Sequence, residues 1–132
     1  MSLTKLYECI ERKKVNNSYA REAIYKVLFE AENCISVSEI IKKLQDTYAK
    51  KVSLNTVYRH LGLFVECELA LVLQDDYKKA YYFLVEEKAN AFTLCRKCNG
   101  ISIVRDEKLE NILCDLHNHE FVTIHKYCNS CI

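Results

Sequence analysis

The sequence predicts an α+β protein in two small parts, a winged helix-turn-helix followed by a second, smaller α+β domain. Three observations predict this fold class. Three segments between residues 18 and 65 carry apolar residues at helical spacing, two β-rich runs follow them, and two Cys-x-x-Cys pairs lie near the C-terminal end. Three helices followed by a hairpin are the element order of a winged helix.

The three helices are predicted from their start signals and their apolar positions. The first clear helix is expected over residues 18–32, the second begins near Ser36 or Ser38, and the third follows Ser53. Ser18 and Ser53 are suitable N-caps, because a serine hydroxyl can accept a hydrogen bond from an early helical N–H group. The residues expected to face the core are Ala20, Ile24, Val27, Leu28, Ala31, Val37, Ile40, Ile41, Leu44, Val57, Leu61 and Phe64.

The β-rich runs place the domain boundaries. Residues 69–74 and 80–85 are expected to form a hairpin whose polar tip is residues 75–79. Residues 1–85 then form the winged helix, residues 86–90 a hinge, and residues 91–132 the second domain. That domain is expected to contain strands 91–94 and 101–104, a helix of about 12 residues and a last strand over 121–127. The helix would present Leu109, Ile112, Leu113 and Leu116 on one face.

The two cysteine pairs have the spacing of a structural metal site. Cys95 and Cys98 form the first pair, Cys128 and Cys131 form the second, and 29 residues lie between the pairs. Four thiolates can surround one Zn²⁺ tetrahedrally, and such a closed shell leaves no open position for catalysis. We therefore expect one structural zinc ion per chain. A redox dithiol is the alternative, although a single pair beside a βαβ pattern would favour it more strongly.

Size and composition are typical of a small cytoplasmic protein. The 132 residues are 50% hydrophobic, so they can form a core, and no apolar run approaches the roughly 20 residues of a membrane span. The N-terminus does not resemble a signal peptide, so metal binding is favoured over disulfides. Most of the other cysteines, which are Cys9, Cys34, Cys67 and Cys114, are expected to be small buried hydrophobic residues. One of Cys34, Cys67 and Cys114 could still act as a sensor.

Charge is divided unevenly along the chain. Residues 1–65 carry 11 basic and 7 acidic residues, a net charge of +4, whereas residues 66–132 carry 8 and 11, a net charge of −3. A basic first half favours a polyanionic partner such as double-stranded DNA.

The third predicted helix carries side chains suited to a DNA groove. Asn55, Thr56, Tyr58 and Arg59 project away from its apolar stripe. Arginine can pair with guanine and asparagine with adenine, while threonine and tyrosine can contact phosphate or a thymine methyl group. A solvated helix face is the alternative, but the position of this helix before a hairpin favours DNA contact. His60 lies on the flank and is expected to be exposed or to contact phosphate.

The segment Ser-Leu-Asn-Thr-Val-Tyr-Arg-His-Leu at residues 53–61 resembles the recognition-helix motif of the ferric uptake regulator (Fur) family. The likeness extends from Ala20-Arg21 to both cysteine pairs. It implies a bacterial, dimeric regulator, usually a repressor, which binds an A/T-rich inverted repeat. It also implies that the four paired cysteines hold structural zinc in a zinc-stapled dimerisation domain. Tyr58 and Arg59 would contact the operator, and Arg21 with Lys13 or Lys14 would lie near DNA backbone or the minor groove.

The sequence departs from the family where members usually bind a regulatory metal at the hinge. The matching positions are Cys34, Phe83, Asn90, Phe92 and Ile103. Phenylalanine and isoleucine offer no lone pair to a cation. We therefore expect effector sensing to be altered or lost.

A second metal site is a further hypothesis. Glu110, Cys114 and His117 are spaced i, i+4 and i+7 on the last predicted helix. The alternative is a polar, solvated helix face that carries one thiol.

Two functions from different classes remain open at this stage. The first is a dimeric transcriptional repressor, and the second is a zinc-stapled protein–protein adaptor that has lost DNA binding. An enzyme is not expected, because the sequence has no Ser/His/Asp constellation, no glycine-rich phosphate loop and no open three-ligand zinc motif.

Overall fold

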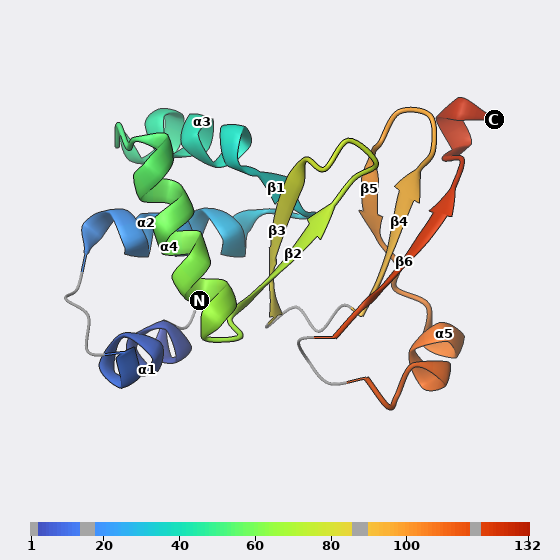
Figure 1. Ribbon diagram of the computed structural model, residues 1–132, viewed down its shortest axis with the longest axis horizontal. Helices are drawn as coiled ribbons and strands as arrows, with labels where there is room; N and C mark the ends of the chain where they lie inside the picture. The colour runs from blue at the N-terminus through green and yellow to red at the C-terminus, as the bar shows by residue number, and fades with distance from the viewer. Residues whose placement is uncertain (1–2, 14–17, 86–89, 117–119) are drawn as a thin grey trace.

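The computed structural model describes residues 3–13, 18–85, 90–116 and 120–132 (Figure 1). Its elements in chain order are α1 (Thr4–Lys13), α2 (Tyr19–Glu30), β1 (Ile35–Ser36), α3 (Val37–Tyr48), α4 (Leu54–Glu66), β2 (Ala70–Gln74), β3 (Ala80–Leu84), β4 (Ala91–Cys95), β5 (Ile101–Ile103), α5 (Glu107–Ile112), β6 (Val122–Lys126) and the 3₁₀ turn η2 (Asn129–Cys131). The helices α1–α4 lie on one side of the β1-β3-β2 sheet, and the β5-β4-β6 sheet lies on the other side.

Serine caps begin the three helices of the winged part, as predicted. The Ser18 and Ser53 hydroxyls accept from the backbone N–H groups of Arg21 and Thr56. Ser36 forms a reciprocal capping box with Glu39 at the start of α3. Each cap satisfies backbone donors that the first helical turn leaves without a partner. The caps therefore fix where α2, α3 and α4 begin.

The wing is a three-stranded antiparallel sheet whose two faces are both covered. Ala70, Tyr82 and Leu84 join the core formed with the helices. Successive side chains in a strand point to opposite faces, so Leu71 and Phe83 point the other way and pack with Phe92 of the C-terminal part. The short strand β1, which was not predicted, pairs with β3 and fastens the start of α3 to the wing.

The C-terminal part is a small sheet in the order β5-β4-β6. Strand β4 pairs with β5 in antiparallel fashion and with β6 in parallel fashion. The fold is therefore α+β, with an N-terminal winged helix-turn-helix and a smaller C-terminal sheet, as predicted. Among the helices that the structure describes, none is long and apolar enough to cross a membrane.

Two helical predictions were wrong. Helix α1 was missed, although it buries Leu6, Cys9 and Ile10 against the helical core. The last helix was expected to have about 12 residues, but α5 has 6 and buries no residue. A helix this short makes few intrahelical hydrogen bonds, and only Leu109 of its residues is even half-buried. The predicted hinge at residues 86–90 falls outside the described residues except for Asn90, so the domain boundary stays a prediction.

Candidate functional site

The exposed face of α4 carries the side chains that were predicted to read DNA. Asn55, Tyr58 and Arg59 are exposed, while Val57 on the opposite face is fully buried. Thr56 is half-buried, and its hydroxyl lies 2.8 Å from the Ser53 hydroxyl. Thr56 therefore helps to order the first turn of α4. Backbone N–H groups at a helix N-terminus also favour an anion such as phosphate.

Arg21 and Arg59 come from different helices and lie close enough for their charges to interact. Arg21 is buried on α2, with 8% of its surface exposed, whereas Arg59 is exposed on α4. Burial lowers the pKa of Arg21, and the positive charge of Arg59 lowers it further. Two neighbouring guanidinium groups create a positive potential at this face, which a phosphate group would relieve.

His60 was predicted to be exposed or to contact phosphate, and this prediction was wrong. Only 3% of its surface is exposed, because it points from α4 into the interior near Arg21. Burial, followed by the charges of Arg21 and Arg59, lowers its pKa from 6.5 to about 4. The imidazole is therefore neutral near pH 7 and acts as a polar core residue.

The exposed lysines near α4 include two that the sequence analysis did not name. Lys13 forms a 2.8 Å ion pair with Glu66 at the C-terminal end of α4. Lys14 lies outside the described residues. Sequence reasoning missed Lys50 and Lys51, which are exposed in the loop before Ser53. A pair of adjacent lysines directly before a helix cap was the signal that could have identified them.

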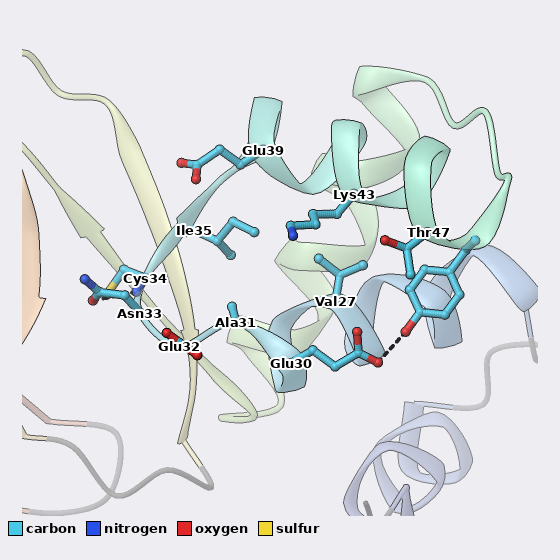
Figure 2. Close-up of a pocket in the computed structure, with 11 residues that line it drawn as sticks. Val27, Glu30, Ala31, Glu32, Asn33, Cys34, Ile35, Glu39, Lys43 and Thr47 are labelled. Carbon is cyan, nitrogen blue, oxygen red and sulfur yellow. Dashed lines mark hydrogen bonds between the residues drawn. The ribbon is translucent and has the colours of Figure 1, made fainter.

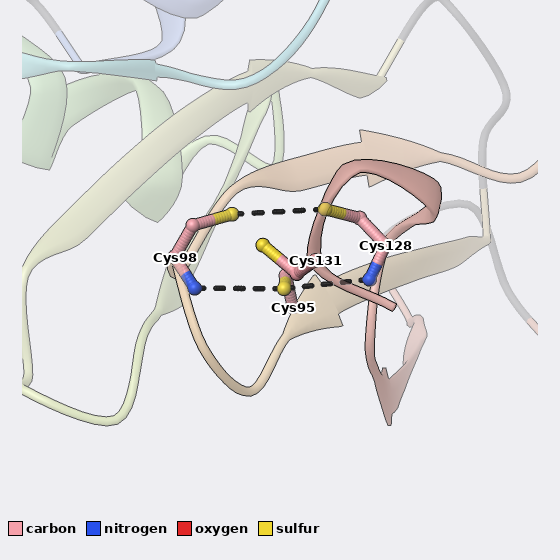
Figure 3. Close-up of side chains that lie close together, drawn as sticks. All are labelled: Cys95, Cys98, Cys128 and Cys131. Carbon is pink, nitrogen blue, oxygen red and sulfur yellow. Dashed lines mark hydrogen bonds between the residues drawn. The ribbon is translucent and has the colours of Figure 1, made fainter.

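The four paired cysteines converge, as predicted. Figure 3 shows Cys95 at the end of β4 and Cys98 in the following turn close to Cys128, which precedes η2, and Cys131, which ends it. Their sulfur atoms all lie within 4.8 Å of one another. The Sγ atoms of Cys98 and Cys128 are 3.9 Å apart. Zinc–sulfur bonds of about 2.3 Å in a tetrahedron place sulfurs about 3.8 Å apart, so the cluster fits a structural zinc ion.

Backbone donors prepare the first pair for a metal. The Cys95 sulfur accepts from the N–H groups of Lys97, Cys98 and Cys128 at 3.4–3.5 Å. These hydrogen bonds lower the pKa of Cys95 to about 5, which favours the thiolate that zinc requires. A Cβ atom at Gly100 would lie 3.3 Å from the Cys98 sulfur, so glycine leaves room for the turn. The convergence of both cysteine pairs, rather than these hydrogen bonds, favours zinc over a redox dithiol.

The sequence model of the ferric uptake regulator family matches residues 12–128. The chain belongs to this family. Fur-family proteins are transcription regulators rather than enzymes, in agreement with the prediction. No curated protein matches the chain in sequence.

Solved structures of family members share the fold at low sequence identity. The Helicobacter pylori ferric uptake regulator, whose structure reveals three functional metal-binding sites, is 22% identical, with a TM-score of 0.80 over 98% of this chain and 90% of that chain. The manganese-bound regulator from Pseudomonas aeruginosa is 19% identical, with a TM-score of 0.74 over 91% and 95%. A zinc uptake regulator in complex with zinc and DNA is 18% identical, with a TM-score of 0.57 over 98% and 91%.

Aromatic side chains fill the contact between the wing and the C-terminal sheet, at positions that the family resemblance matched to regulatory-metal ligands. The rings of Phe83 and Phe92 meet edge to face with centroids 5.5 Å apart, and Phe92 meets Phe121 at 5.7 Å. Ile103 pairs with Phe92 across the C-terminal sheet and joins the same cluster. We call Phe83, Phe92, Ile103 and Phe121 the hinge cluster. It packs the wing directly against the C-terminal sheet.

Cys34 lies beside a cavity of about 410 Å³ between the end of α2 and α3. Figure 2 shows Asn33 and Cys34 at the end of this cavity nearest the wing strands, and Glu30 with its hydrogen bond from Tyr48 farther away. The Asn33 side chain also donates to the Ile101 carbonyl of the C-terminal sheet. Burial raises the pKa of Cys34 to about 12, so its thiol is protonated near pH 7. A protonated thiol is a poor nucleophile and metal ligand.

The second metal site stays a prediction. Glu110 lies on α5, whereas Cys114 lies beyond the end of that helix and is exposed. His117 falls outside the described residues, so its position relative to Glu110 and Cys114 cannot be described. Within the described ranges, the paired cysteines are the one group that could hold a metal ion.

Cys9 and Cys67 were predicted to be separate buried thiols, and this prediction needs correction. Both are buried, but they form a disulfide that links α1 to the end of α4 across 58 residues of sequence. The link follows from the docking of α1, the helix that the sequence analysis missed. The residue type alone predicted that these cysteines would be buried. Their pairing depends on a tertiary contact that the sequence does not reveal.

Proposed function

We propose that this Fur-family protein is a dimeric, sequence-specific DNA-binding repressor that reads an A/T-rich inverted repeat. The observation that carries the proposal is the exposed polar face of α4, formed by Asn55, Tyr58 and Arg59, on a winged-helix frame. These side chains can reach base edges, and the exposed Lys50 and Lys51 are suited to phosphate contacts, while the buried Arg21 adds positive charge behind them. Such a regulator would act in the cytoplasm, where bacterial DNA is found.

Dimerisation would be provided by the C-terminal part. Strand β6 is at the edge of its sheet, and exposed apolar residues surround it. Ile124 and Tyr127 are 38% and 50% exposed, and Ile112 on α5 is 74% exposed. A second copy that covers these residues would hold two α4 helices on one DNA face, about 34 Å apart. Sedimentation should therefore give a dimer at micromolar protein with and without DNA, and a monomer under both conditions would contradict the assembly.

Each chain would carry one structural zinc, and the hinge would not sense iron or manganese. The hinge cluster supports this part of the proposal, because it offers aromatic rings and an isoleucine where a cation needs lone pairs. The rings instead fix the wing against the C-terminal sheet. A protein held in its DNA-binding conformation without an effector would be constitutively competent.

The adaptor alternative is not favoured. The family consists of transcription regulators, and a solved relative of the same fold is a zinc uptake regulator in complex with zinc and DNA. The polar face of α4 would also have no assigned role in an adaptor.

Salt dependence tests DNA binding directly. Fluorescence anisotropy of a labelled A/T-rich duplex should show affinity that falls steeply with salt, because each neutralised phosphate releases counterions. Lys50→Ala and Lys51→Ala should each lower the slope of log affinity against log salt by about 1. Lys108→Ala on α5 is the matched control and should leave the slope unchanged. An absence of measurable binding at about 50 mM salt would contradict the proposed function.

A further inference from the structure

The Cys9–Cys67 disulfide lies where α1 docks onto the end of α4. Cys67 is the C-cap of α4, and Cys9 is one of the three buried residues of α1. Two neighbouring contacts join the same elements: Arg12 donates to the Cys67 carbonyl at 3.4 Å, and Lys13 pairs with Glu66. Much of the attachment of α1 is therefore concentrated at the sulfur pair.

Helix α1 also touches the start of α2. The Glu22 carboxylate lies close enough to Tyr7 to raise the pKa of its hydroxyl through its negative charge, after the larger effect of burial. Glu22 directly follows Arg21, the buried arginine that faces Arg59 of α4. The C-terminal half of α1 is thus fixed to the end of α4. Tyr7, nearer the start of α1, interacts with Glu22 in the first turn of α2. Docking of α1 braces the two helices that present these arginines.

The buried sulfur pair borders an open cavity. Cys9 and Cys67 both line this cavity of about 260 Å³, together with Lys5, Glu8, Arg12, Glu68, Leu69 and Val85. Lys5 and Arg12 are exposed cations beside the sulfurs. Glu8 and Glu68 add two carboxylates to the same lining, so its charges balance and the open cavity itself gives a thiol access to the sulfurs.

We propose that Cys9 and Cys67 form a reversible thiol–disulfide switch that locks α1 against α2 and α4. In the closing direction, the thiolate of one cysteine attacks glutathione disulfide, forming a mixed disulfide and releasing one glutathione thiolate. The second cysteine thiolate then attacks the protein sulfur of that mixed disulfide and releases the second glutathione. The two protein thiols are oxidised, glutathione disulfide is reduced to two glutathione molecules, and the released thiolates take up the two protons. Excess glutathione reverses both steps.

The locked and open states should differ in the mobility of α1. Without the disulfide, only non-covalent contacts, chiefly the packing of Leu6, Cys9 and Ile10, hold α1 in place, so the helix opens more often. If the proposed function holds, the locked state presents Arg21 and Arg59 in a fixed relation and binds DNA more tightly. This last consequence rests on the proposed function, whereas the switch itself does not.

The test uses the full-length, zinc-loaded protein equilibrated in glutathione buffers of increasing oxidised fraction. Trypsin yields peptides 6–12 and 60–78, each with one cysteine, so their disulfide-linked pair identifies the bond by mass spectrometry. Hydrogen exchange of amides in residues 4–13 then reports the docking of α1. Cys9→Ser/Cys67→Ser represents the open state, and Cys34→Ser/Cys114→Ser is the matched control that keeps the switch.

We expect the linked pair to rise with the oxidised fraction and to disappear when excess reduced glutathione is added. Exchange protection of α1 should be about tenfold higher in the oxidised form than in the reduced form. DNA affinity should be about fivefold higher in the oxidised form, with no difference in the Cys9→Ser/Cys67→Ser variant.

Two results would overturn the switch: no linked peptide pair in any buffer, or equal protection of α1 in both forms. Equal DNA affinity of both forms would overturn the coupling to DNA. If the pair titrates and α1 protection changes but neither form binds DNA, the proposed function fails while the switch stands.

Discussion

Arg59 is the residue whose removal best separates base reading from general attraction to DNA. It is exposed on α4 beside Tyr58, and its guanidinium group can pair with a guanine edge. Arg59→Ala should weaken specific binding by about 1–3 kcal/mol and lose sequence discrimination before nonspecific binding is lost. Competition between a selected operator and a scrambled duplex measures this.

Two variants sharpen that experiment. Arg105→Ala removes an exposed arginine of the C-terminal part and should leave discrimination intact. Tyr58→Phe should cost less than Arg59→Ala if the ring makes an apolar contact, and more if the hydroxyl anchors a phosphate. Unchanged sequence preference in Arg59→Ala would refute the role assigned to this residue.

His60 should make stability depend on pH. Its pKa is 6.5 in the unfolded chain and about 4 in the folded protein, so between these values the unfolded state binds a proton that the folded state excludes. The free energy of unfolding should therefore fall as pH falls from about 6.5 to about 4, by at most about 3 kcal/mol. Denaturant unfolding at several pH values measures it. His60→Gln should flatten this segment of the curve.

At the scale of elements, the turn after β4 and the segment around η2 depend on the zinc ion. Cys131→Ser removes one ligand of a closed shell and should release the metal and disorder the C-terminal sheet. Zinc analysis together with far-UV circular dichroism measures both effects. Cys114→Ser is the matched control, because this exposed thiol lies outside the cluster. Metal-free wild type that stays folded and dimeric would contradict a structural role for zinc.

The contact between the wing and the C-terminal sheet should make DNA binding insensitive to Fe²⁺ and Mn²⁺. Phe83 and Phe92 fill the contact, and neither can ligate a cation. Titrating each metal into zinc-replete protein should change operator affinity by less than threefold. Phe92→Ala should cost about 3–5 kcal/mol of stability through the cavity it leaves. A tenfold gain in affinity with either metal, about 1.4 kcal/mol of coupling, would show that the hinge still senses metal.

Titration with excess Zn²⁺ distinguishes a regulatory metal site that has moved to the last predicted helix from a regulatory metal site that has been lost. A gain in affinity with Zn²⁺ alone, abolished in Cys114→Ser, would support the second metal site predicted at Glu110, Cys114 and His117. No response to Zn²⁺ would support the solvated-face alternative.

For the whole molecule, features with a local cause were predictable and features with a tertiary cause were not. Helices α2–α4 have serine caps and apolar stripes, and the cysteine spacing alone indicated the zinc cluster. Helix α1 carries an apolar stripe as well, since Leu6, Cys9 and Ile10 are spaced i, i+3 and i+4, and this local signal was overlooked. The burial of His60 and the pairing of Cys9 with Cys67 depend instead on tertiary packing.

The central claim is that two copies of this protein read a symmetric DNA sequence through α4. The most direct measurement is selection from a random duplex pool with zinc-loaded protein, followed by sequencing of the bound fraction. We predict enrichment of an A/T-rich inverted repeat whose half-sites are one helical turn or a multiple apart, and no enrichment with Arg59→Ala. A wild-type pool with no enriched sequence, or with a single asymmetric site, would contradict the account.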